Sequence, residues 1–439
     1  MLIPACDTKL LPIRKLRWFE ALFPKAKEPV EDTASELVME EVKTDLGALE
    51  CFRARLIDYR KTGRGNIRIA YYGDSIIEGD LITGMLRKLF QDEYGGVGVG
   101  MMPITSIVAG FRPTIKHSFS KNWESVSFMS KGKADVALGI TGFTFIPRPY
   151  YIIEKAMEQK VDTLAVIDSL RVESPKSVKR IALNSPPWVK YQAQSALGGA
   201  GHFGRIRMFY SHAGDSSFVM CSLDNQAPQK LRLRPGNTPQ VLELNSSGNI
   251  KTLYLEFSPT DPIHVYGVSF DEDKGAYVDS YTIRGYSGMY FERIDAEHLK
   301  GYQRALDYDL LILHYGENVS HPKIKDYGFY YRGMTRTLAH IKSALPDVPV
   351  LLISAHGRSI KEEGKYVVSP DIPLLVGKQA EIAKDNGCAY INIYEAMGGS
   401  SAMADYVAKG MAQKDYTHFT RKGAEHLGQM IYKMIKGQK

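Results

Sequence analysis

The fold of this chain is decided by the stretch Ile67-Arg-Ile-Ala-Tyr-Tyr-Gly-Asp-Ser-Ile76. Residues 67–72 are rich in β-branched and aromatic side chains, which predicts a short strand that ends at Gly73. The residues that follow carry apolar side chains at helical spacing, namely Leu81, Met85, Leu86, Leu89 and Phe90. A strand, a turn and an amphipathic helix in this order are typical of an α/β domain.

The same alternation of strands and helices returns after Ala276. Near-continuous apolar runs predict buried strands at 309–314, 348–355 and 388–393. Helices are expected at 35–59, 330–344, 373–386 and 421–435. Buried strands that alternate with helices indicate a parallel sheet covered on both faces.

The middle of the chain has a different character. Many short runs of β-branched and aromatic residues are separated there by turn signals such as Pro235-Gly236-Asn237, which suggests a β-sandwich. A helix over 150–166 is an open alternative within this region. We expect a leader or linker at 1–34, a split α/β domain at 35–110 and 276–439, and an inserted β-sandwich at 111–275.

Composition excludes several classes of protein. Charged residues make up 24% and apolar residues 44%, as in globular rather than disordered chains. The net charge of +7 is small for 439 residues, and no dense Lys/Arg run with interleaved aromatics indicates nucleic acid. No apolar run reaches the roughly 18 residues of a membrane span. Four scattered cysteines favour neither a disulfide scaffold nor a zinc site.

The N-terminus leaves two readings open. No charged and apolar leader precedes the first polar residues as the sequence is written, so no signal peptide is expected. The stretch Met-Leu-Ile-Pro-Ala-Cys6 nevertheless resembles the end of a bacterial lipoprotein signal, with Met1 as an internal start and Cys6 as the lipidated residue. The alternative is a plain apolar N-terminus. Membrane association is expected only if Cys6 is lipidated.

The segment Tyr72-Gly73-Asp74-Ser75 lies at the end of the first predicted strand. Ligands of open parallel sheets bind beyond the carboxyl ends of the strands, so Ser75 is well placed as a nucleophile. In the alternative interpretation, Asp74 or Ser75 only caps the next helix. The tripeptide recurs as Gly214-Asp215-Ser216 in the β-rich part, where we expect a hairpin turn.

The segment Asp415-Tyr-Thr-His418 precedes the C-terminal helix. A serine nucleophile needs a general base, and that base needs a carboxylate that orients it. At a spacing of three residues in a turn, Asp415 can accept from one imidazole nitrogen of His418 while the other faces the serine. The alternative makes Asp415 a cap and His418 a surface residue.

Two further loops end predicted strands. Asn318, in Gly316-Glu-Asn318, can donate its side-chain amide to a developing oxyanion. Gly288, in Arg284-Gly-Tyr-Ser-Gly288, offers an unobstructed backbone N–H, although glycine and serine also occur in ordinary loops. His356 follows a buried strand and is a candidate for supporting the site, with a purely structural role as the alternative.

The order Gly-Asp-Ser, Gly, Gly-x-Asn and Asp-x-x-His resembles the SGNH (GDSL-type) hydrolase superfamily. The resemblance implies a flavodoxin-like three-layer α/β/α fold, with Ser75 as nucleophile, His418 as base and Asp415 orienting it. It also implies an oxyanion hole formed by the Ser75 and Gly288 N–H groups and the Asn318 side chain, with Asp74 and His356 in support. No metal or organic cofactor is implied.

The tracts 48–102 and 396–428 resemble the bacterial branch that contains peptidoglycan O-acetylesterases. Members of that branch carry an early inserted β-sandwich similar to a carbohydrate-binding module. The sequence departs from the family pattern at Ile76, where leucine is usual, and at Val319, where an acidic residue is usual. The second departure changes the hydrogen bonding expected around Asn318.

We expect a serine esterase that removes O-acetyl groups from a polysaccharide, with peptidoglycan favoured by the resemblance. An SGNH O-acetyltransferase acting on a cell-envelope glycan shares the acyl-enzyme and stays an alternative. A non-catalytic glycan-binding protein is a further one, with candidate stacking aromatics at Trp123, Trp188, Tyr191 and Tyr210. No nucleic-acid partner is expected. The expected location is the bacterial cell envelope, periplasmic or as an outer-membrane lipoprotein, or secretion.

Overall fold

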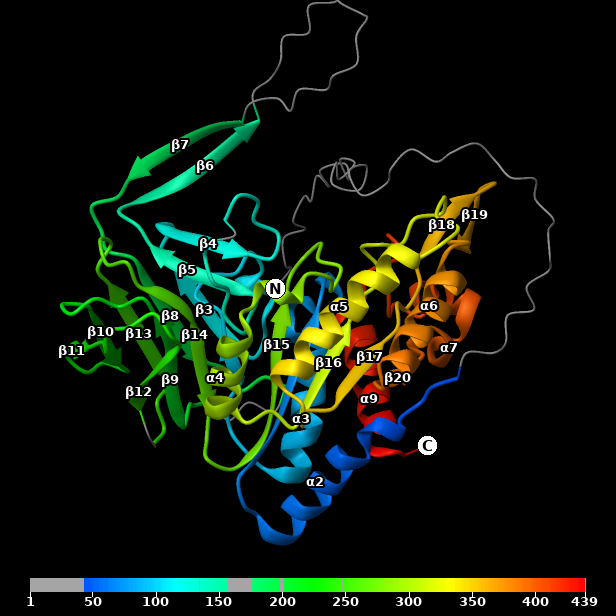
Figure 1. Cartoon of the computed structure of the whole chain (residues 1–439), viewed down its shortest axis with the longest axis horizontal. Coiled ribbons are helices and arrows are strands. Elements are labelled where there is room, and N and C mark those ends of the chain that lie inside the picture. Colours follow the sequence, from blue (N-terminus) through cyan, green and yellow to red (C-terminus); the bar gives the residue numbers. More distant parts are fainter. Residues whose placement is uncertain (1–42, 134, 157–175, 198–200, 246–247, 439) are drawn as a thin grey trace, which may run out of the picture. The chain divides into compact units, whose positions relative to one another are not determined.

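A parallel sheet organises the α/β part of the protein. The computed structural model describes residues 43–133, 135–156, 176–197, 201–245 and 248–438. Within these residues the sheet has the order β15-β1-β16-β17-β20, and neighbouring strands run parallel (Figure 1). The strands are β1 (Asn66–Gly73), β15 (Gly275–Thr282), β16 (Leu310–His314), β17 (Val350–Ile353) and β20 (Ala389–Ile391).

The strand order fixes where a ligand site can form. Numbered along the chain, the sheet strands are arranged 2-1-3-4-5, which is the flavodoxin-like order. The direction of the connections reverses between β1 and β16, whose last residues Gly73 and His314 pair in register. A crevice opens at such a switch point beyond the carboxyl ends of the strands. The loops that follow β1 and β16 therefore meet there.

Helices cover both faces of the sheet. Side chains alternate along each strand, so Ile67, Ile69 and Tyr71 of β1 enter the core beneath one group of helices. That group is α2 (Glu50–Thr62), α3 (Leu81–Tyr94) and α9 (Arg421–Lys436). The opposite group is α4 (Ala296–Leu306), α5 (Gly328–Ala344) and α6 (Ile372–Asp385). The predicted three-layer α/β/α architecture is confirmed.

The remaining short helices lie near the ends of these elements. They are η1 (Gly47–Leu49), η2 (Ser75–Asp80), η3 (Ala109–Phe111), η4 (Phe291–Arg293), α7 (Ile393–Met397), η5 (Gly399–Ser401) and α8 (Ala402–Ala408). No helix in the described part of the chain has the length and apolar character needed to cross a membrane.

The helix predicted at 35–59 is partly wrong. In the part of the prediction that the structure describes, from residue 43, helical structure begins at Gly47. Asp45 Oδ1 accepts from the Gly47 N–H at 3.0 Å, and the Asp45 backbone pairs with Tyr390 beside β20. Residues 35–42, and with them the predicted leader at 1–34 and Cys6, lie outside the described residues.

Two antiparallel sheets form the β-rich part. Among the described residues, one sheet has the order β11-β10-β13-β8-β3 and the other β12-β9-β14-β5-β4, with β2 paired to β14. The first sheet contains β3 (Ile115–Phe119), β8 (Trp188–Ala193), β10 (Phe218–Leu223), β11 (Gln229–Arg232) and β13 (Thr252–Phe257). The second contains β2 (Gly100–Met102), β4 (Trp123–Ser127), β5 (Phe143–Pro147), β9 (Arg205–Ser211), β12 (Gln240–Asn245) and β14 (His264–Asp271).

The two sheets pack face to face over one apolar core. Side chains from both enter it, among them Val189 and Leu255 from one sheet and Met208 and Val268 from the other. The expected β-rich insertion is therefore present. The strand β2 joins it from residue 100 onward, so the β-sheet begins before the boundary predicted at 110/111.

Two local expectations in this part are wrong. The segment Tyr150–Ala156 is a strand, β6, paired with β7 (Lys176–Ala182), rather than the start of a helix. Gly214-Asp215-Ser216 does not close a hairpin, because β9 and β10 on either side of it belong to different sheets. It is the turn by which the chain crosses between sheets, with the Ser217 N–H donating to Gly214 O at 3.1 Å.

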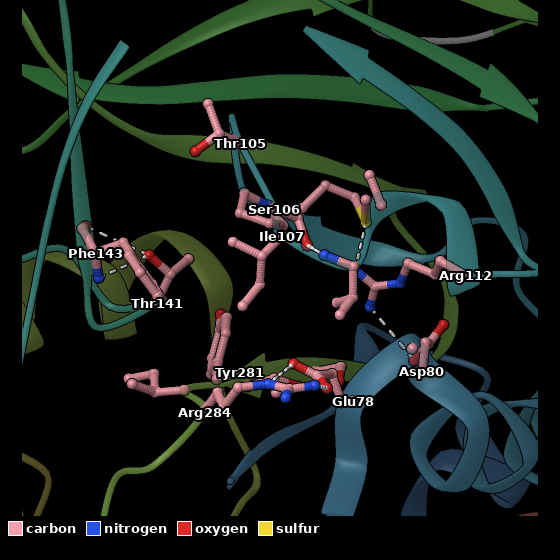
Figure 2. A pocket seen from close by; sticks show the side chains of 18 of the residues that line it. Glu78, Asp80, Thr105, Ser106, Ile107, Arg112, Thr141, Phe143, Tyr281 and Arg284 are labelled. Atoms are coloured by element: carbon pink, nitrogen blue, oxygen red, sulfur yellow. Dashed lines mark hydrogen bonds and ion pairs between the residues drawn. The ribbon is translucent and has the colours of Figure 1, made fainter. Parts of the chain in front are cut away.

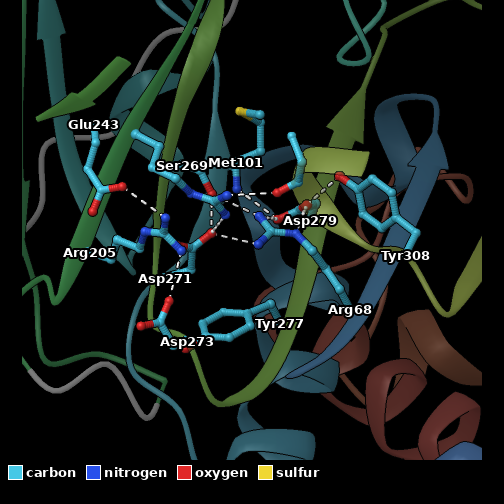
Figure 3. A network of polar contacts seen from close by, with 12 residues as sticks. Arg68, Met101, Arg205, Glu243, Ser269, Asp271, Asp273, Tyr277, Asp279 and Tyr308 are labelled. Carbon is cyan, nitrogen blue, oxygen red and sulfur yellow. Dashed lines mark hydrogen bonds and ion pairs between the residues drawn. The ribbon is translucent and has the colours of Figure 1, made fainter. Parts of the chain in front are cut away.

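A buried cluster of charges joins the β-rich part to the parallel sheet (Figure 3). Arg68 of β1 is fully buried and donates to Asp279 Oδ2 of β15 at 2.8 Å and to Asp271 Oδ2 of β14 at 2.6 Å. Arg207 of β9 also donates to Asp271, at 2.7 Å, and Tyr308 donates to Asp279 at 2.5 Å. The two carboxylates are thus compensated by arginines from both parts of the molecule.

Replacing Arg68 should strongly destabilise the protein. In Arg68→Ala, Asp271 and Asp279 lose their shared cation inside the core, which typically costs about 3–5 kcal/mol. Urea unfolding followed by circular dichroism measures the loss. Lys300→Ala, which removes the partner of Glu297 in a pair whose side chains are 42% and 72% exposed, serves as control and should change stability by less than about 0.5 kcal/mol. Equal effects of the two substitutions would contradict the role given to Arg68.

Candidate active site

Ser75, His418 and Asp415 lie in one chain of hydrogen bonds. Ser75 Oγ is 3.2 Å from His418 Nε2, and His418 Nδ1 is 2.8 Å from Asp415 Oδ2. Since Nδ1 faces a carboxylate, it carries the proton in the neutral ring, which leaves the Nε2 lone pair for the serine hydroxyl. This is the arrangement of a serine, its base and an orienting carboxylate.

Local structure explains how the serine is presented. Strand β1 ends at Gly73, and Ser75 is the first residue of η2. Asp74 caps that helix by accepting from the Ile76 N–H at 3.0 Å. The first N–H groups of a helix have no partner inside it, so the Ser75 N–H is available to an anionic atom held in front of the serine. Asp74 is therefore a cap, and Ser75 is left to face His418.

The turn that carries Asp415 and His418 is fixed by its own hydrogen bonds. Asp415 Oδ1 accepts from the backbone N–H groups of Thr417 and His418, each at 3.0 Å. Gln413 N–H donates to His418 O at 2.7 Å and closes the base of the turn. The carboxylate thus holds both the backbone and the ring of His418.

Asn318 ties three loops together. Its Nδ2 group donates to Asp74 Oδ2 at 2.7 Å and to Tyr286 O at 3.2 Å. These contacts connect the loop after β16 with the loops after β1 and β15. Both amide hydrogens have protein acceptors in this arrangement, so donation to an oxyanion would require one of these bonds to be exchanged.

Gly288 lies in the same loop as Tyr286. Its φ of 88° is left-handed, and a Cβ there would lie 2.7 Å from the Tyr315 ring, so a side chain does not fit. Its carbonyl accepts from Thr337 Oγ1 at 3.1 Å, which anchors the loop to α5. The position therefore requires glycine on conformational and steric grounds.

His356 is buried next to these loops. Its Nε2 is 2.9 Å from Thr417 O, within the Asp415–His418 turn, and its Nδ1 is 3.1 Å from Glu317 Oε1. Glu317 precedes Asn318 and also accepts from the Gly357 N–H at 3.0 Å. His356 therefore bridges the loop of Asn318 and the turn of His418, and it is not directed at Ser75.

The surroundings perturb the ionisation of three groups. The hydrogen bond that His418 donates to Asp415 raises the pKa of His418 above its usual value, and Asp74 adds to this while burial and Arg284 oppose it. Burial opposes ionisation of Asp415, but its hydrogen bonds with His418 and Thr417 outweigh burial and lower its pKa to about 2. Burial raises the pKa of Asp74 to about 7, and Glu317 contributes to this shift.

A cavity of about 280 Å³ has walls from both parts of the molecule, and Ser75, Asp415 and His418 are not among the residues that line it (Figure 2). One wall comes from the α/β part and holds Glu78, which follows Ser75 by three residues, and Arg284, whose charge acts on His418. Arg284 Nε donates to Glu78 Oε1 at 3.1 Å. The opposite wall comes from the β-rich part and includes Ile107, which is 81% exposed. Hydroxyl groups such as that of Thr141 also line the cavity.

Sequence reasoning missed Glu78, Arg284 and Ile107. Arg284 lies in the segment that was singled out for Gly288, but nothing in its spacing pairs it with Glu78, which is 206 residues away. Ile107 stands among other apolar residues in the segment 104–111, and its 81% exposure is a property of the folded loop that the sequence does not show.

Comparison with known proteins shows which solved structure shares this fold. No family model matches the chain, and a search of curated proteins finds no match. Among solved structures, a peptidoglycan O-acetylesterase superposes with a TM-score of 0.66 at 18% identity, covering 90% of this chain and 98% of that one. This chain has the same fold as that esterase, in line with the α/β/α fold that the resemblance to SGNH hydrolases implies. The superposition spans nearly the whole of both chains, so it includes the β-rich insertion.

Other solved structures are similar over smaller parts or less closely. A family two carbohydrate esterase from Cellvibrio japonicus has a TM-score of 0.27 at 10% identity, covering 74% of this chain and 98% of its own. The periplasmic domain of a lipopolysaccharide acetyltransferase from Salmonella ser. Paratyphi A has a TM-score of 0.28 at 14% identity, covering 36% and 72%. Scores this low add nothing to the assignment of the SGNH fold.

Catalysis through Ser75 and His418 should depend on pH in a way that Asp415 controls. A base works only when neutral, so kcat/KM for an aryl acetate should rise with pH through the pKa of His418, with a midpoint above about 6.5. Asp415→Asn removes the group that raises this pKa, so the midpoint should fall toward about 6.5 and kcat should drop. A pH–rate profile of both proteins measures this. An unchanged midpoint would contradict the coupling of His418 to Asp415.

Proposed function

We propose that the protein is a serine esterase that removes O-acetyl groups from a polysaccharide. The observation that carries this proposal is the alignment of Ser75 Oγ with His418 Nε2 at 3.2 Å and of His418 Nδ1 with Asp415 Oδ2 at 2.8 Å. The alignment lies at the switch point of the sheet, where ligands of such folds bind.

The reaction follows from this geometry. Ser75 Oγ attacks the acetyl carbonyl while His418 Nε2 takes its proton, and Asp415 stabilises the imidazolium that forms. The tetrahedral intermediate expels the sugar oxygen, which takes the proton from His418, and acetyl-Ser75 remains. A water molecule then attacks the acetyl carbon with His418 again as base, which releases acetate and restores Ser75.

The oxyanion of the intermediate is stabilised mainly by backbone donors. The Ser75 N–H lies at the start of η2, a short helix interrupted at Glu78 and Gly79, and has no partner within that helix. The Gly288 N–H belongs to a loop that is held by Thr337 and by Asn318 through Tyr286 O. Asn318 contributes chiefly by fixing these loops, and it can donate directly when its bond to Tyr286 O opens.

A polysaccharide substrate is supported by the cavity that Glu78 and Arg284 line. It is formed by both parts of the molecule and combines an exposed apolar side chain, hydroxyl groups and the Arg284–Glu78 pair. Sugars present apolar faces and hydroxyl edges, so such a mixed surface suits a saccharide that extends away from the acetylated ring. We extend the proposal to peptidoglycan, the substrate named for the similar esterase, and to a location in the cell envelope or outside the cell.

An O-acetyltransferase is the second candidate. The acetyl-enzyme is the same, and a glycan hydroxyl replaces water as the acceptor. Exposure of Asp415 and His418 favours hydrolysis, because each side chain is 40% exposed and water reaches the site. A purely glycan-binding role is disfavoured, because Trp123, Tyr191 and Tyr210 are buried in the sandwich core and cannot stack on a sugar.

Substitution of the serine tests the esterase proposal. Ser75→Ala should lower acetate release from an aryl acetate by at least about 1,000-fold, because the nucleophile is lost while binding remains. Ser216→Ala, in the second Gly-Asp-Ser, is the matched control and should leave turnover unchanged. Release of acetate from O-acetylated peptidoglycan by the unmodified protein tests the substrate. Unchanged turnover of Ser75→Ala would refute the proposal.

A substitution in the cavity distinguishes binding of the polysaccharide from the chemical reaction at Ser75. Ile107→Glu should raise KM for an O-acetylated polysaccharide several-fold, since it places a charge on an apolar contact surface, and should leave aryl acetate turnover unchanged. Ile57→Glu is the control, because Ile57 is 54% exposed on α2 and does not line the cavity. Equal KM values for the two variants would exclude the cavity from substrate binding.

A further inference from the structure

The turn Asp415–His418 is contacted by a hairpin that no motif includes. Strands β18 (Ser359–Glu362) and β19 (Lys365–Val368) form an antiparallel pair that projects beside α6 (Figure 1). The Tyr366 ring of β19 stacks on the Tyr416 ring, with centroids 3.6 Å apart and planes inclined by 12°. The Ser359 N–H of β18 donates to Tyr416 O at 3.1 Å. The hairpin thus holds both the side chain and the backbone of the residue that follows Asp415.

Tyr416 needs such support. Its φ of 54° is left-handed, a conformation that a bulky residue adopts only when its surroundings impose it. The left-handed residue reverses the chain between Asp415 and His418, so that Asp415 Oδ1 reaches the Thr417 and His418 N–H groups. If Tyr416 relaxed to an ordinary conformation, Asp415 and His418 would separate.

The base of the hairpin is anchored to the loop of Asn318. Arg358, which precedes β18, donates to Ser320 O at 2.9 Å. Asp371, which follows β19, accepts from Ser320 Oγ at 2.8 Å and from Tyr327 Oη at 2.6 Å. The Ser369 N–H closes the hairpin by donating to Arg358 O at 2.9 Å. The hairpin is therefore fixed at its base to the loop that follows β16, while its strands contact the turn of His418.

We infer that Tyr366 is a positioning residue, which keeps His418 aligned with Ser75 by holding Tyr416 in its left-handed conformation. The inference rests on the proposed role of His418 as base. The Tyr366 ring is 43% exposed, so it contributes little to a hydrophobic core. The inference gives this ring a role in positioning His418. Tyr366 itself does not touch the reacting atoms.

Kinetics of Tyr366 variants test this inference. Tyr366→Ala should lower kcat for an aryl acetate by about 10-fold or more with KM unchanged, since displacing a catalytic group by about 1 Å can cost on the order of 100-fold. Tyr366→Phe keeps the stacked ring and should stay close to the unmodified protein. Val367→Ala is the matched control, because adjacent strand residues point to opposite faces. Active-site titration corrects each rate for the fraction of folded enzyme.

A second readout does not depend on activity. His418 is faced by Asp415 from its own turn, by Asp74 from the loop after β1 and by Arg284 from the loop after β15. Asp415 raises the pKa of His418 through the contact that the turn maintains. In Tyr366→Ala the midpoint of the His418 titration, followed by NMR, should move down toward about 6.5, and in Tyr366→Phe it should not.

The outcomes are distinct. A lower kcat and a lower titration midpoint in Tyr366→Ala alone support the inference. An unchanged kcat and midpoint would overturn it, and so would a rise of KM for the polysaccharide at constant kcat, which would make the ring a sugar contact. If the unmodified protein hydrolysed no ester, the proposed function would fail, while the titration would still report whether Tyr366 holds the turn.

Discussion

The molecule depends on one buried cation in β1, an interior strand of its parallel sheet. Arg68 has no exposed surface and binds Asp279 in the neighbouring strand β15 and Asp271 in the sandwich strand β14. A charge in this position is stable only while all its partners are in place, so separating the sandwich from the sheet would leave carboxylates and a guanidinium unpaired. This cluster therefore holds the sandwich against the parallel sheet.

The same strand also places the proposed chemistry. Strand β1 continues from Arg68 to Gly73, and the next two residues are Asp74 and Ser75. Because the connections reverse between β1 and β16, the loop with Asn318 falls beside Asp74, and the Asn318 side chain joins them. The turn of His418 then completes the site from the C-terminal part of the chain. Three buried or half-buried contacts, through Asn318, His356 and Tyr366, fix its loops relative to one another.

Much of this could be predicted from the sequence because it depends on local patterns. Alternation and apolar runs located β1, β16, β17 and β20 to within a few residues but missed β15. Short polar motifs after predicted strands and before the C-terminal helix marked Ser75, Asn318, Asp415 and His418. The structure brings Ser75, Asp415 and His418 into contact. The Asn318 amide, which was expected to be available to an oxyanion, donates to Asp74 instead. Their catalytic roles stay predictions, as do the boundaries of the domains and the lipidation of Cys6.

The rest depends on contacts between distant segments, which no local pattern encodes. Arg284 binds Glu78, and Tyr366 stacks on Tyr416, only because the fold brings their loops together. The aromatic residues of the insertion were ambiguous for the same reason: Trp123, Tyr191 and Tyr210 prove to be core, whereas Trp188 stacks on Tyr254 in a half-buried position. Whether an aromatic ring is buried depends on how the two sheets of the sandwich pack, and the residues next to the ring in the sequence do not determine it.

The central claim is that His418 activates Ser75 as a nucleophile. The most direct measurement is peptide mapping by mass spectrometry after the protein reacts with a fluorophosphonate, which modifies only serines activated by a neighbouring base. The account predicts one adduct, on the peptide that contains Ser75, and its loss in His418→Ala. Absence of the adduct, or an adduct on Ser216 in the second Gly-Asp-Ser, would contradict it.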